Sequence, residues 1–392
     1  MSPNLPRVGI ISDRVFPCNQ ADTQQIVKNA SALARSGLHV ELVVPRQREW
    51  AFRPRGERLR ELSDYYHLES AAEITQLLSL PAGDLRAPVK VVHGVAAPLY
   101  LAARRFDVAY SRNIFPGLLC LSLGLRVVYE SYRAWGDEHP RLVAAAGLLA
   151  RHPRFVGLIT HSHYAAESLC RSGFPADRVL VAHCGFDPAD MEPRLSREAA
   201  RAAIGRPTGG RLVVYAGNLE PIQDIESILE VASLLPEVDF LLVGGHPGDV
   251  SRLTAHADRV GAGNVALAGH RPVAEVARYL YAADVLVIPP SSRPLRVHHR
   301  TVLPLKTFSY LAAGRPILAP DLPDSGELLT AQNALLVKPD DPVGTARALR
   351  ALLDDPPRAD RLAAAARDTS QRLTWDARAE RIRDWLVQRI GA

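Results

Sequence analysis

A lysine at the start of a predicted helix is the strongest candidate for chemistry in this chain. From Leu303 to Asp321 the sequence reads Leu-Pro-Leu-Lys-Thr-Phe-Ser-Tyr-Leu-Ala-Ala-Gly-Arg-Pro-Ile-Leu-Ala-Pro-Asp. Pro304 can open a helix, because the amide that proline lacks would have no partner in the first turn. The remaining amides of that turn attract an anion, and Lys306 adds a compact positive charge. The segment predicts a phosphate site at Leu305 and Lys306, unless this is a surface helix that simply contains one lysine.

A polar, basic loop precedes this helix and completes a candidate diphosphate cradle. Residues 291–300 read Ser-Ser-Arg-Pro-Leu-Arg-Val-His-His-Arg and follow a predicted strand. In this cradle Arg300 would support Lys306. Gly217 lies in a turn between a predicted strand and helix, where glycine lets the chain bend tightly beside a phosphate. A plain strand-to-helix turn is the simpler interpretation of that segment taken alone.

The signals of other enzyme classes are missing from the sequence. Residues 13–22, after the first predicted strand, contain no Gly-x-Gly-x-x-Gly, and Gly-Gly-His-Pro-Gly at 244–248 is too short for a Walker loop. These features argue against a dehydrogenase and a P-loop enzyme. We expect no metal site and reduced thiols, because neither the acidic and histidine residues nor the four scattered cysteines have ligand spacing.

The charge of the chain favours acidic ligands. Its net charge is +5 and its pI is about 9.1, which suits sugar nucleotides or anionic membrane surfaces but is too weak to indicate nucleic acid. Residues 46–60 contain six arginines, two glutamates, Trp50 and Phe52. This cluster is either a solvated loop and helix start or a peripheral contact with a membrane. No signal peptide or spanning segment is predicted, so we expect a cytoplasmic protein, with the inner face of the membrane as the alternative.

Short apolar runs alternate with helical patterns along the chain, which indicates α/β domains with parallel sheets covered on both faces. This alternation of strand and helix patterns is interrupted near residues 185–210. We therefore predict an N-terminal domain over 1–190, a C-terminal domain over 205–374 and a tail helix over 375–392. The predicted strands are residues 8–12, 38–44, 89–92, 107–110, 126–129, 156–160 and 178–181 in the first half, and 211–216, 238–243, 264–267, 284–288, 315–319 and 334–337 in the second.

The lysine segment resembles a family signature. It is similar to the Pro-Leu-Lys-x-Phe-Glu-Tyr-x-Ala-x-Gly-x-Pro-Ile pattern of a subgroup of retaining GT-B glycosyltransferases of family 4, also called group 1. Further segments follow the order of that family: residues 215–225, 239–245, 264–269, 281–290 and 333–341. The resemblance is specific over 211–341 and looser before residue 185, at 107–113, 127–130 and 183–187.

The resemblance implies two doubly wound, Rossmann-like domains that face each other across a central crevice, with the tail helix crossing back to the first. It implies transfer of a sugar from a nucleoside-diphosphate sugar to a hydroxyl acceptor, with retention of the anomeric configuration, as in polysaccharide biosynthesis. The acceptor would be a glycan, a lipid-linked molecule or a small molecule. No cofactor is expected besides the donor substrate.

The resemblance also assigns residues. The catalytic candidates on the donor side are Lys306, Asn218 and Arg300, and the donor-binding candidates are Gly217, Gly244, Thr301, Leu305, Lys306 and Ser309. The acceptor wall would hold Asn19, Gln20, Arg112 and Tyr132. Four positions depart from the family pattern. Thr301 and Ser309 replace glutamates, Asn218 replaces an arginine, and Gln223 lies near the position where the family usually has a lysine. A serine binds two ribose hydroxyls less well than a carboxylate, so these departures predict donor binding that is weakened, reshaped or lost.

Two rival functions remain open from the sequence. The first is a catalytically degenerate GT-B scaffold or glycan-binding partner of another glycosyltransferase, which the residues at Thr301 and Ser309 motivate. The second is a two-domain sugar-nucleotide epimerase. That activity requires a carboxylate and a histidine arranged in the crevice, and the sequence shows no clear set of this kind.

Overall fold

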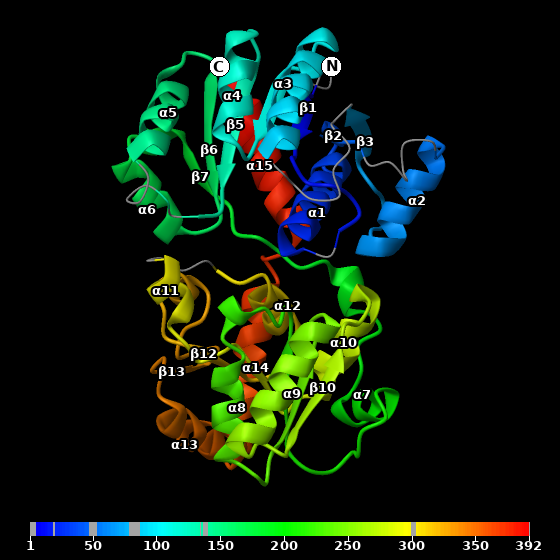
Figure 1. The fold of residues 1–392 in the computed structure, drawn as a ribbon, viewed down its shortest axis with the longest axis vertical. Coiled ribbons are helices and arrows are strands. Elements are labelled where there is room, and N and C mark those ends of the chain that lie inside the picture. The colour runs from blue at the N-terminus through cyan, green and yellow to red at the C-terminus, as the bar shows by residue number, and fades with distance from the viewer. Residues whose placement is uncertain are drawn as a thin grey trace. The chain divides into compact units, whose positions relative to one another are not determined.

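The computed structural model describes residues 5–18, 20–46, 53–77, 87–133, 135, 140–298 and 303–391. The chain divides into two compact units (Figure 1). The first contains Met1–Cys184 and Trp375–Ala392, and the second contains Gly185–Thr374. The second unit begins at Gly185, ahead of the predicted domain end at 190. The reason is local: the Phe186 amide donates to the Leu373 carbonyl and ties this segment to the end of the same unit.

The first unit is built on a seven-stranded parallel sheet in the order β3-β2-β1-β4-β5-β6-β7. The order reverses between β1 and β4, which is the topological switch point of a doubly wound sheet. The strands are β1 (Arg7–Ile11), β2 (His39–Pro45), β3 (Glu73–Leu77), β4 (Val108–Ser111), β5 (Arg126–Ser131), β6 (Phe155–Thr160) and β7 (Val179–Val181). β4 and β6 are buried at every residue, and β5 is buried at every residue after Arg126, as expected for strands covered on both faces.

Helices cover this sheet and include the tail of the chain. They are α1 (Ala21–Arg35), α2 (Arg55–Tyr66), α3 (Ala87–Ala103), α4 (Ile114–Ser122), α5 (Pro140–Arg151), α6 (His163–Arg171) and α15 (Trp375–Gly391). The tail helix α15 packs against α1. An ion pair of 2.6 Å between Arg35 and Asp376 joins these two helices.

One strand prediction for the first unit fails, and one strand of this unit was not predicted. The strand predicted at residues 89–92 lies inside α3. The apolar pattern there continues over the 17 residues of that helix, which is too long for a typical strand. β3 was not predicted, because Glu73–Leu77 has only two apolar residues, Ile74 and Leu77, without strict alternation, and forms an edge of the sheet.

The second unit is built on a six-stranded parallel sheet in the order β10-β9-β8-β11-β12-β13. Each strand predicted for this half is present at its expected place: β8 (Leu212–Ala216), β9 (Asp239–Val243), β10 (Val265–Gly269), β11 (Val285–Val287), β12 (Ile317–Pro320) and β13 (Leu335–Val337). Its helices are α7 (Arg197–Ala203), α8 (Glu226–Ser233), α9 (Pro247–Val260), α10 (Val273–Ala282), α11 (Arg293–His298), α12 (Lys306–Ala313), α13 (Pro342–Leu353) and α14 (Pro356–Ser370). The prediction of two doubly wound α/β domains is confirmed.

The helix that carries the candidate lysine starts later than its proline suggests. Leu305 is the N-cap of α12, and Lys306 is its first helical residue. The Pro304 carbonyl accepts a hydrogen bond from the Thr307 amide, so the proline closes the turn in front of the helix. Gly314 ends α12 in the left-handed conformation, with φ of 61°, where a side chain on the backbone would be strained.

Candidate functional site

The candidate donor site lies where the strand order of the second sheet reverses. β8 and β11 are neighbours at this point, and the loops that leave their carboxyl ends run to opposite sides. Ligands of doubly wound sheets bind at such a point, because the diverging loops leave room between them. The loop after β8 carries Gly217, Asn218 and the short 3-10 helix Pro221–Gln223.

The amine of Lys306 lies over this loop. Its Nζ is 3.3 Å from the Gln223 side-chain oxygen and 5.1 Å from the centre of the Tyr215 ring. The side chain keeps some contact with solvent, yet protein atoms surround the amine. Burial lowers the pKa of Lys306 to about 8. An ammonium has three hydrogens to donate, and among the described residues only Gln223 accepts one, so donors remain for an anionic ligand.

Gly217 and Gly244 supply space at the site. A β-carbon on Gly217 would lie 2.8 Å from Cε of Lys306, and one on Gly244 would lie 1.9 Å from the Gly217 carbonyl oxygen. Any side chain at either position would push the lysine or the backbone away. Their amides are already used, since Gly217 donates to Val243 and Gly244 donates to Gly269. The two glycines therefore permit a close approach and are not free hydrogen-bond donors.

Asn218 presents the donor half of its carboxamide. Its side-chain oxygen accepts a 3.0 Å hydrogen bond from the Glu220 amide, and its main-chain carbonyl accepts one of 2.6 Å from the Tyr215 hydroxyl. The side-chain nitrogen makes no hydrogen bond within the described residues, and the residue is exposed. Asn218 can therefore donate to a ligand but brings no charge, unlike the arginine of the family pattern.

Ser309 lies on α12, one helical turn after Lys306. Its hydroxyl donates a hydrogen bond of 3.1 Å to the Lys306 carbonyl of the same helix. The two side chains are neighbours on one face, because residues three apart in a helix are adjacent. The other predicted residues of this helix start, Arg300 and Thr301, lie outside the described residues.

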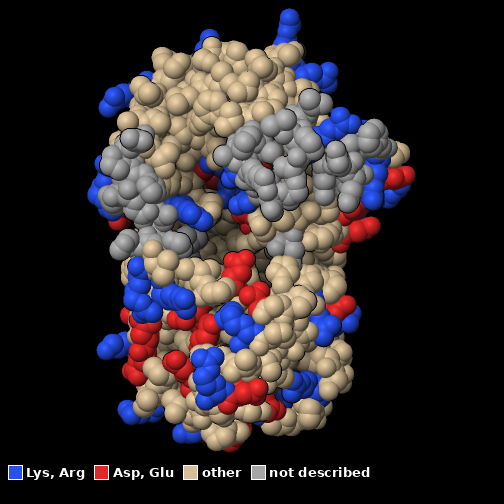
Figure 2. Space-filling view, viewed as in Figure 1, with Lys and Arg blue, Asp and Glu red and all other residues tan. Residues whose placement is uncertain are grey.

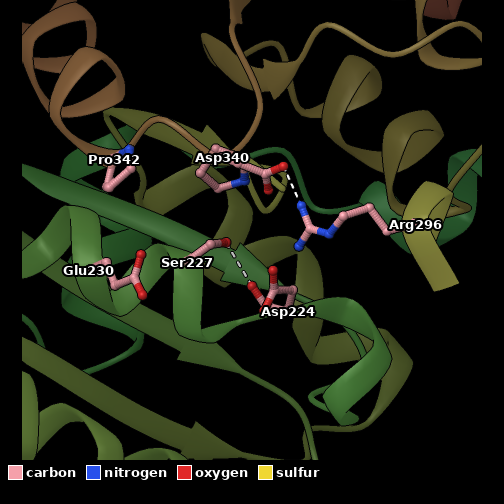
Figure 3. A pocket seen from close by; sticks show the side chains of 7 residues that line it. Asp224, Ser227, Glu230, Arg296, Asp340 and Pro342 are labelled. Atoms are coloured by element: carbon pink, nitrogen blue, oxygen red, sulfur yellow. Dashed lines mark hydrogen bonds and ion pairs between the residues drawn. The ribbon is translucent and has the colours of Figure 1, made fainter. Parts of the chain in front are cut away.

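A polar pocket of about 320 Å³ opens beside this site (Figure 3). Asp224, which follows Gln223, and Asp340, which follows β13, both have left-handed backbones, with φ of 53° and 61°. Asp224 accepts hydrogen bonds from Ser291 and from Arg293, and Asp340 accepts them from Ser292 and Arg296. Figure 3 shows the Arg296 side chain pointing toward Asp340. These two acids hold the start of α11, in the loop that leads toward Lys306.

Sequence reasoning missed this pocket. The segment 215–225 resembles the family turn Gly-Asn-x-x-x-x-Gln-Gly-Ile. Asp224 occupies the place of its second glycine, and its backbone there is left-handed. Aspartate is one of the few residues other than glycine that tolerates this conformation. The sequence therefore contained a sign of this pocket, because an aspartate occupies a glycine position. The ion pair between Asp224 and Arg293, in contrast, depends on the fold.

The first unit holds a buried polar cluster at the carboxyl ends of β5 and β6. Glu130 accepts hydrogen bonds of 2.8 Å from His161 and 2.6 Å from Arg378 of α15. Burial by itself raises the pKa of Glu130, but the bond from His161 and the charges of Arg378 and Arg112 outweigh it and hold that pKa well below its usual range. Burial lowers the pKa of His161 to about 4, so its imidazole is neutral at pH 7.

The thiol of Cys184 extends this cluster without making it a nucleophilic site. Its sulfur lies 3.3 Å from Nδ1 of His161, whose other nitrogen bonds Glu130, so the order resembles a cysteine-histidine-carboxylate triad. However, Cys184 is buried, and burial raises the pKa of its thiol to about 12. The thiolate needed for attack is therefore absent at neutral pH, and the group is structural.

Two of the predicted acceptor-side residues lie together next to this cluster. The Arg112 guanidinium stacks over the Tyr132 ring at 4.8 Å, and the same ring stacks on His161. Arg112 also contacts Glu130 at 3.7 Å and donates to Gln25 of α1 at 3.3 Å. Gln20 is exposed at the N-cap of α1, where its carbonyl accepts a bond from Thr23. Asn19 lies outside the described residues.

Several known proteins are similar to this chain in sequence or in structure. Residues 210–355 match the family model described as glycosyl transferases group 1. The D-inositol 3-phosphate glycosyltransferase of Xylanimonas cellulosilytica is 28% identical, over 98% of this chain and 97% of the relative. The sucrose-phosphate synthase of Thermosynechococcus elongatus has a similar structure, with a TM-score of 0.77, 18% identity and 98% of each chain covered. The HepE protein of Anabaena, solved with UDP-glucose, gives a TM-score of 0.74 at 16% identity, over 98% of this chain and 100% of the other.

The chain has the GT-B fold. Residues 210–355, which include Lys306 and both glycines of the site, match the model of the group 1 glycosyl transferases. This match confirms the family resemblance of the lysine segment at that level. Membership in the Pro-Leu-Lys-x-Phe-Glu-Tyr subgroup stays a prediction, as do the roles of the individual site residues and the crevice between the domains.

Proposed function

We propose that this group 1 glycosyltransferase transfers a sugar from a nucleoside-diphosphate sugar to a hydroxyl acceptor with retention of anomeric configuration. The observation that carries the proposal is the placement of Lys306. Its ammonium, at the first residue of a helix, lies over a turn cleared of side chains by Gly217 and Gly244. Positive charge, a helix start and open backbone are together what a diphosphate requires.

The reaction breaks the bond between the sugar anomeric carbon and the diphosphate oxygen. A new bond forms from the acceptor oxygen, and the proton of that hydroxyl passes to the departing phosphate. Negative charge grows on the diphosphate as its bond breaks, so a cation fixed beside it lowers the barrier. Lys306 fits that role, with Asn218 as a neutral donor. A front-face transfer of this kind retains configuration and requires no carboxylate nucleophile.

Structural neighbours suggest which donors to test first. HepE of Anabaena was solved with UDP-glucose, and the trehalose-6-phosphate protein of E. coli was solved with UDP-2-fluoro glucose. We therefore place uridine donors at the head of the panel. Because the identity of these neighbours to this chain is low, they support the shared fold alone. The assay decides the base and the sugar of the donor.

We further propose that the acceptor carries an acidic group. Arg112 is nine-tenths buried, and its Nη1 has no hydrogen-bond partner in the described part of the protein. The neighbouring charges are Glu130 and Arg378, which already pair with each other, so Arg112 leaves an excess positive charge. Relatives named D-inositol 3-phosphate glycosyltransferase are consistent with an acceptor that bears a phosphate.

A transfer assay tests the proposal directly. Purified protein is incubated with UDP-, GDP-, ADP- and TDP-sugars, with and without phosphorylated polyols, and release of nucleoside diphosphate is measured. We expect release with at least one donor, faster in the presence of a phosphorylated acceptor. Binding of nucleotides without any release would overturn the catalytic proposal. Equal rates with phosphorylated and unphosphorylated polyols would overturn the acidic acceptor alone.

A non-catalytic scaffold is the second candidate, and one observation favours it. The hydroxyl at Ser309, where the family has its ribose-binding glutamate, is already engaged with the Lys306 carbonyl. A protein of this kind would bind a partner glycosyltransferase or a glycan and release no nucleotide. The same release assay, together with nucleotide binding at millimolar concentration, separates the two functions.

A further inference from the structure

Large apolar side chains gather on the outer face of three helices of the first unit. α3 exposes them at a spacing of four residues, so they form a stripe along the helix. Leu99 is 50% exposed, Phe115 of α4 is 51% exposed and Leu148 of α5 is 64% exposed. The apolar face is defined by Val91, Val95, Leu99, Phe115, Leu142 and Leu148.

The three helices form one continuous surface. α4 packs against α3 on one side and against α5 on the other. The Phe115 ring lies 3.1 Å from the position of a β-carbon on Gly94 of α3, so the absence of a side chain there lets the ring lie across α3. On the other side, a β-carbon on Gly117 of α4 would lie 2.9 Å from Leu149 of α5. The exposed residues therefore lie on three helices that pack side by side, and an apolar surface of this kind marks an interaction site.

In the described parts of these three helices the charged residues have one sign. The sequences of α3, α4 and α5 contain no aspartate or glutamate. Each helix is followed by exposed arginines at its C-terminal end, which form a rim of Arg104, Arg105, Arg126, Arg151 and Arg154. Asp107 follows α3 close to Arg104 and Arg105, and its carboxylate accepts a hydrogen bond from the Arg7 amide. In Figure 2 the surface at the top of the view, over α3 and α4, is tan with blue side chains at its margin.

We propose that this apolar face with its arginine rim binds the surface of an anionic phospholipid membrane. Apolar side chains enter the boundary between headgroups and acyl chains, and arginines beside them bind lipid phosphates. A second copy of the chain fits less well, because it brings the same positive rim and no acid for it. Among the described residues no helix is long and apolar enough to cross the bilayer, so the contact is peripheral.

This face differs from the basic segment 46–60 that the sequence singles out. In the described part of that segment, Arg53 pairs with Glu61 and Arg55 pairs with Glu73. Each of those charges is balanced by a neighbouring acid. The rim residues Arg104, Arg126 and Arg151 have no such ion pair among the described residues, so their charge is available to lipid phosphates.

Vesicle binding tests the proposal with the full-length protein. Flotation is measured with vesicles of phosphatidylcholine alone and with vesicles that contain about one-third phosphatidylglycerol. We expect binding to the anionic vesicles, weakened by salt, and little binding to the neutral ones. Replacing Leu99 and Leu148 together by serine should weaken binding at least ten-fold. Replacing Arg104, Arg126 and Arg151 by glutamine should weaken it about five-fold for each arginine.

Matched substitutions in the second unit serve as controls. Leu234 and Val343 are exposed there to a similar degree, as are Arg259 and Arg347. Their replacement by serine and glutamine, respectively, should leave vesicle binding unchanged. The proposal is overturned if the wild type does not float with anionic vesicles, or if the control and face variants lose binding equally. It is also overturned if the protein is a dimer that the Leu99 and Leu148 substitutions dissociate, because the face would then bind a second copy.

Discussion

A β-carbon placed on Gly244 would stand 1.9 Å from the carbonyl oxygen of Gly217. The two loops that follow β8 and β9 thus touch backbone to backbone beside Lys306. The contact is possible only because Gly244 has no side chain, and Gly244 also has a φ of 127°, a conformation that other residues rarely adopt. The position of the lysine amine depends on this contact.

Gly244→Ala should therefore damage both the fold and the donor site. Overpacking costs about 1–3 kcal/mol, and the backbone conformation adds to it. We expect a lower free energy of unfolding in urea and weaker binding of nucleoside diphosphate. Gly248→Ala is the control, since a β-carbon there meets nothing within 4 Å and the residue lies in α9. Equal stability of the two variants would contradict the steric argument.

Lys306→Ala should weaken binding of a nucleoside diphosphate about ten-fold or more, while binding of the nucleoside stays nearly unchanged. The reason is that a charge-assisted hydrogen bond contributes about 1.5–3 kcal/mol. Isothermal titration with UDP and uridine measures both affinities. Lys338→Ala removes an exposed lysine of the same unit and should affect neither ligand. An equal loss for both ligands would place Lys306 away from the phosphates.

The affinity for nucleoside diphosphate should fall as the pH rises above about 8. Burial lowers the pKa of Lys306 to about 8, and only the ammonium form binds the anion. Above that pH the charged fraction falls ten-fold for each pH unit, and the affinity falls toward that of the Lys306→Ala variant. Below it, Lys306 is mostly charged and its contribution is constant. In Lys306→Arg the decline should disappear, because a guanidinium remains charged. A decline that persists in this variant would belong to another group.

Part of this site can be predicted from the sequence because the information is local. Lys306, its helix start and Gly314 lie within one segment, so the pattern of residues predicts both the charge and the turn. The same holds for the strands of the second unit, which are continuous apolar runs between helical patterns. Tyr215 of β8 and Gln223 of the loop after it, which contact the lysine amine, are distant in the sequence. Only the order of the strands in the sheet brings Tyr215 and Gln223 to the amine of Lys306.

The buried ion pair on the acceptor side, in contrast, could not be predicted from the sequence. Arg378 lies in a tail helix with several other arginines, and its sequence does not distinguish a buried arginine from a surface one. Its partner Glu130 is 248 residues away. The sequence predicts that the tail is helical and amphipathic. The ion pair exists only because α15 packs on the first unit, and so it could not be predicted.

Glu130→Gln should destabilise the first unit strongly. The substitution leaves Arg378 and Arg112 without their carboxylate, and breaking a buried pair costs about 3–5 kcal/mol. Asp376→Asn is the matched control: it breaks the pair with Arg35, which also joins α15 to the unit, but its carboxylate is 49% exposed. We expect a cost of at most about 1 kcal/mol there. Chemical denaturation measures both, and similar costs would show that the Glu130 cluster is not essential to stability.

Ser309 separates an active enzyme from a scaffold. It lies one turn after Lys306 on α12, so a donor whose phosphates meet the helix start would extend its ribose toward Ser309. The hydroxyl now donates to the Lys306 carbonyl, but it can rotate and make a neutral hydrogen bond to the ribose, which contributes about 0.5–1.5 kcal/mol. A carboxylate makes stronger bonds to two hydroxyls.

Ser309→Glu should therefore tighten binding of nucleoside diphosphates, by up to about ten-fold, because a charged hydrogen bond contributes about 1–1.5 kcal/mol more than a neutral one. Ser309→Ala, as the control, should weaken it by less than that factor. Titration with UDP and with its 2′-deoxy form measures the effect and its origin, since a carboxylate that binds the ribose loses its advantage when the hydroxyl is absent. If Ser309→Glu leaves the affinity flat or reduces it, and the wild type binds no nucleotide at millimolar concentration, the ribose pocket is absent. The scaffold function would then replace the transferase function, because a helix start that holds a phosphate cannot select a donor without a site for its ribose.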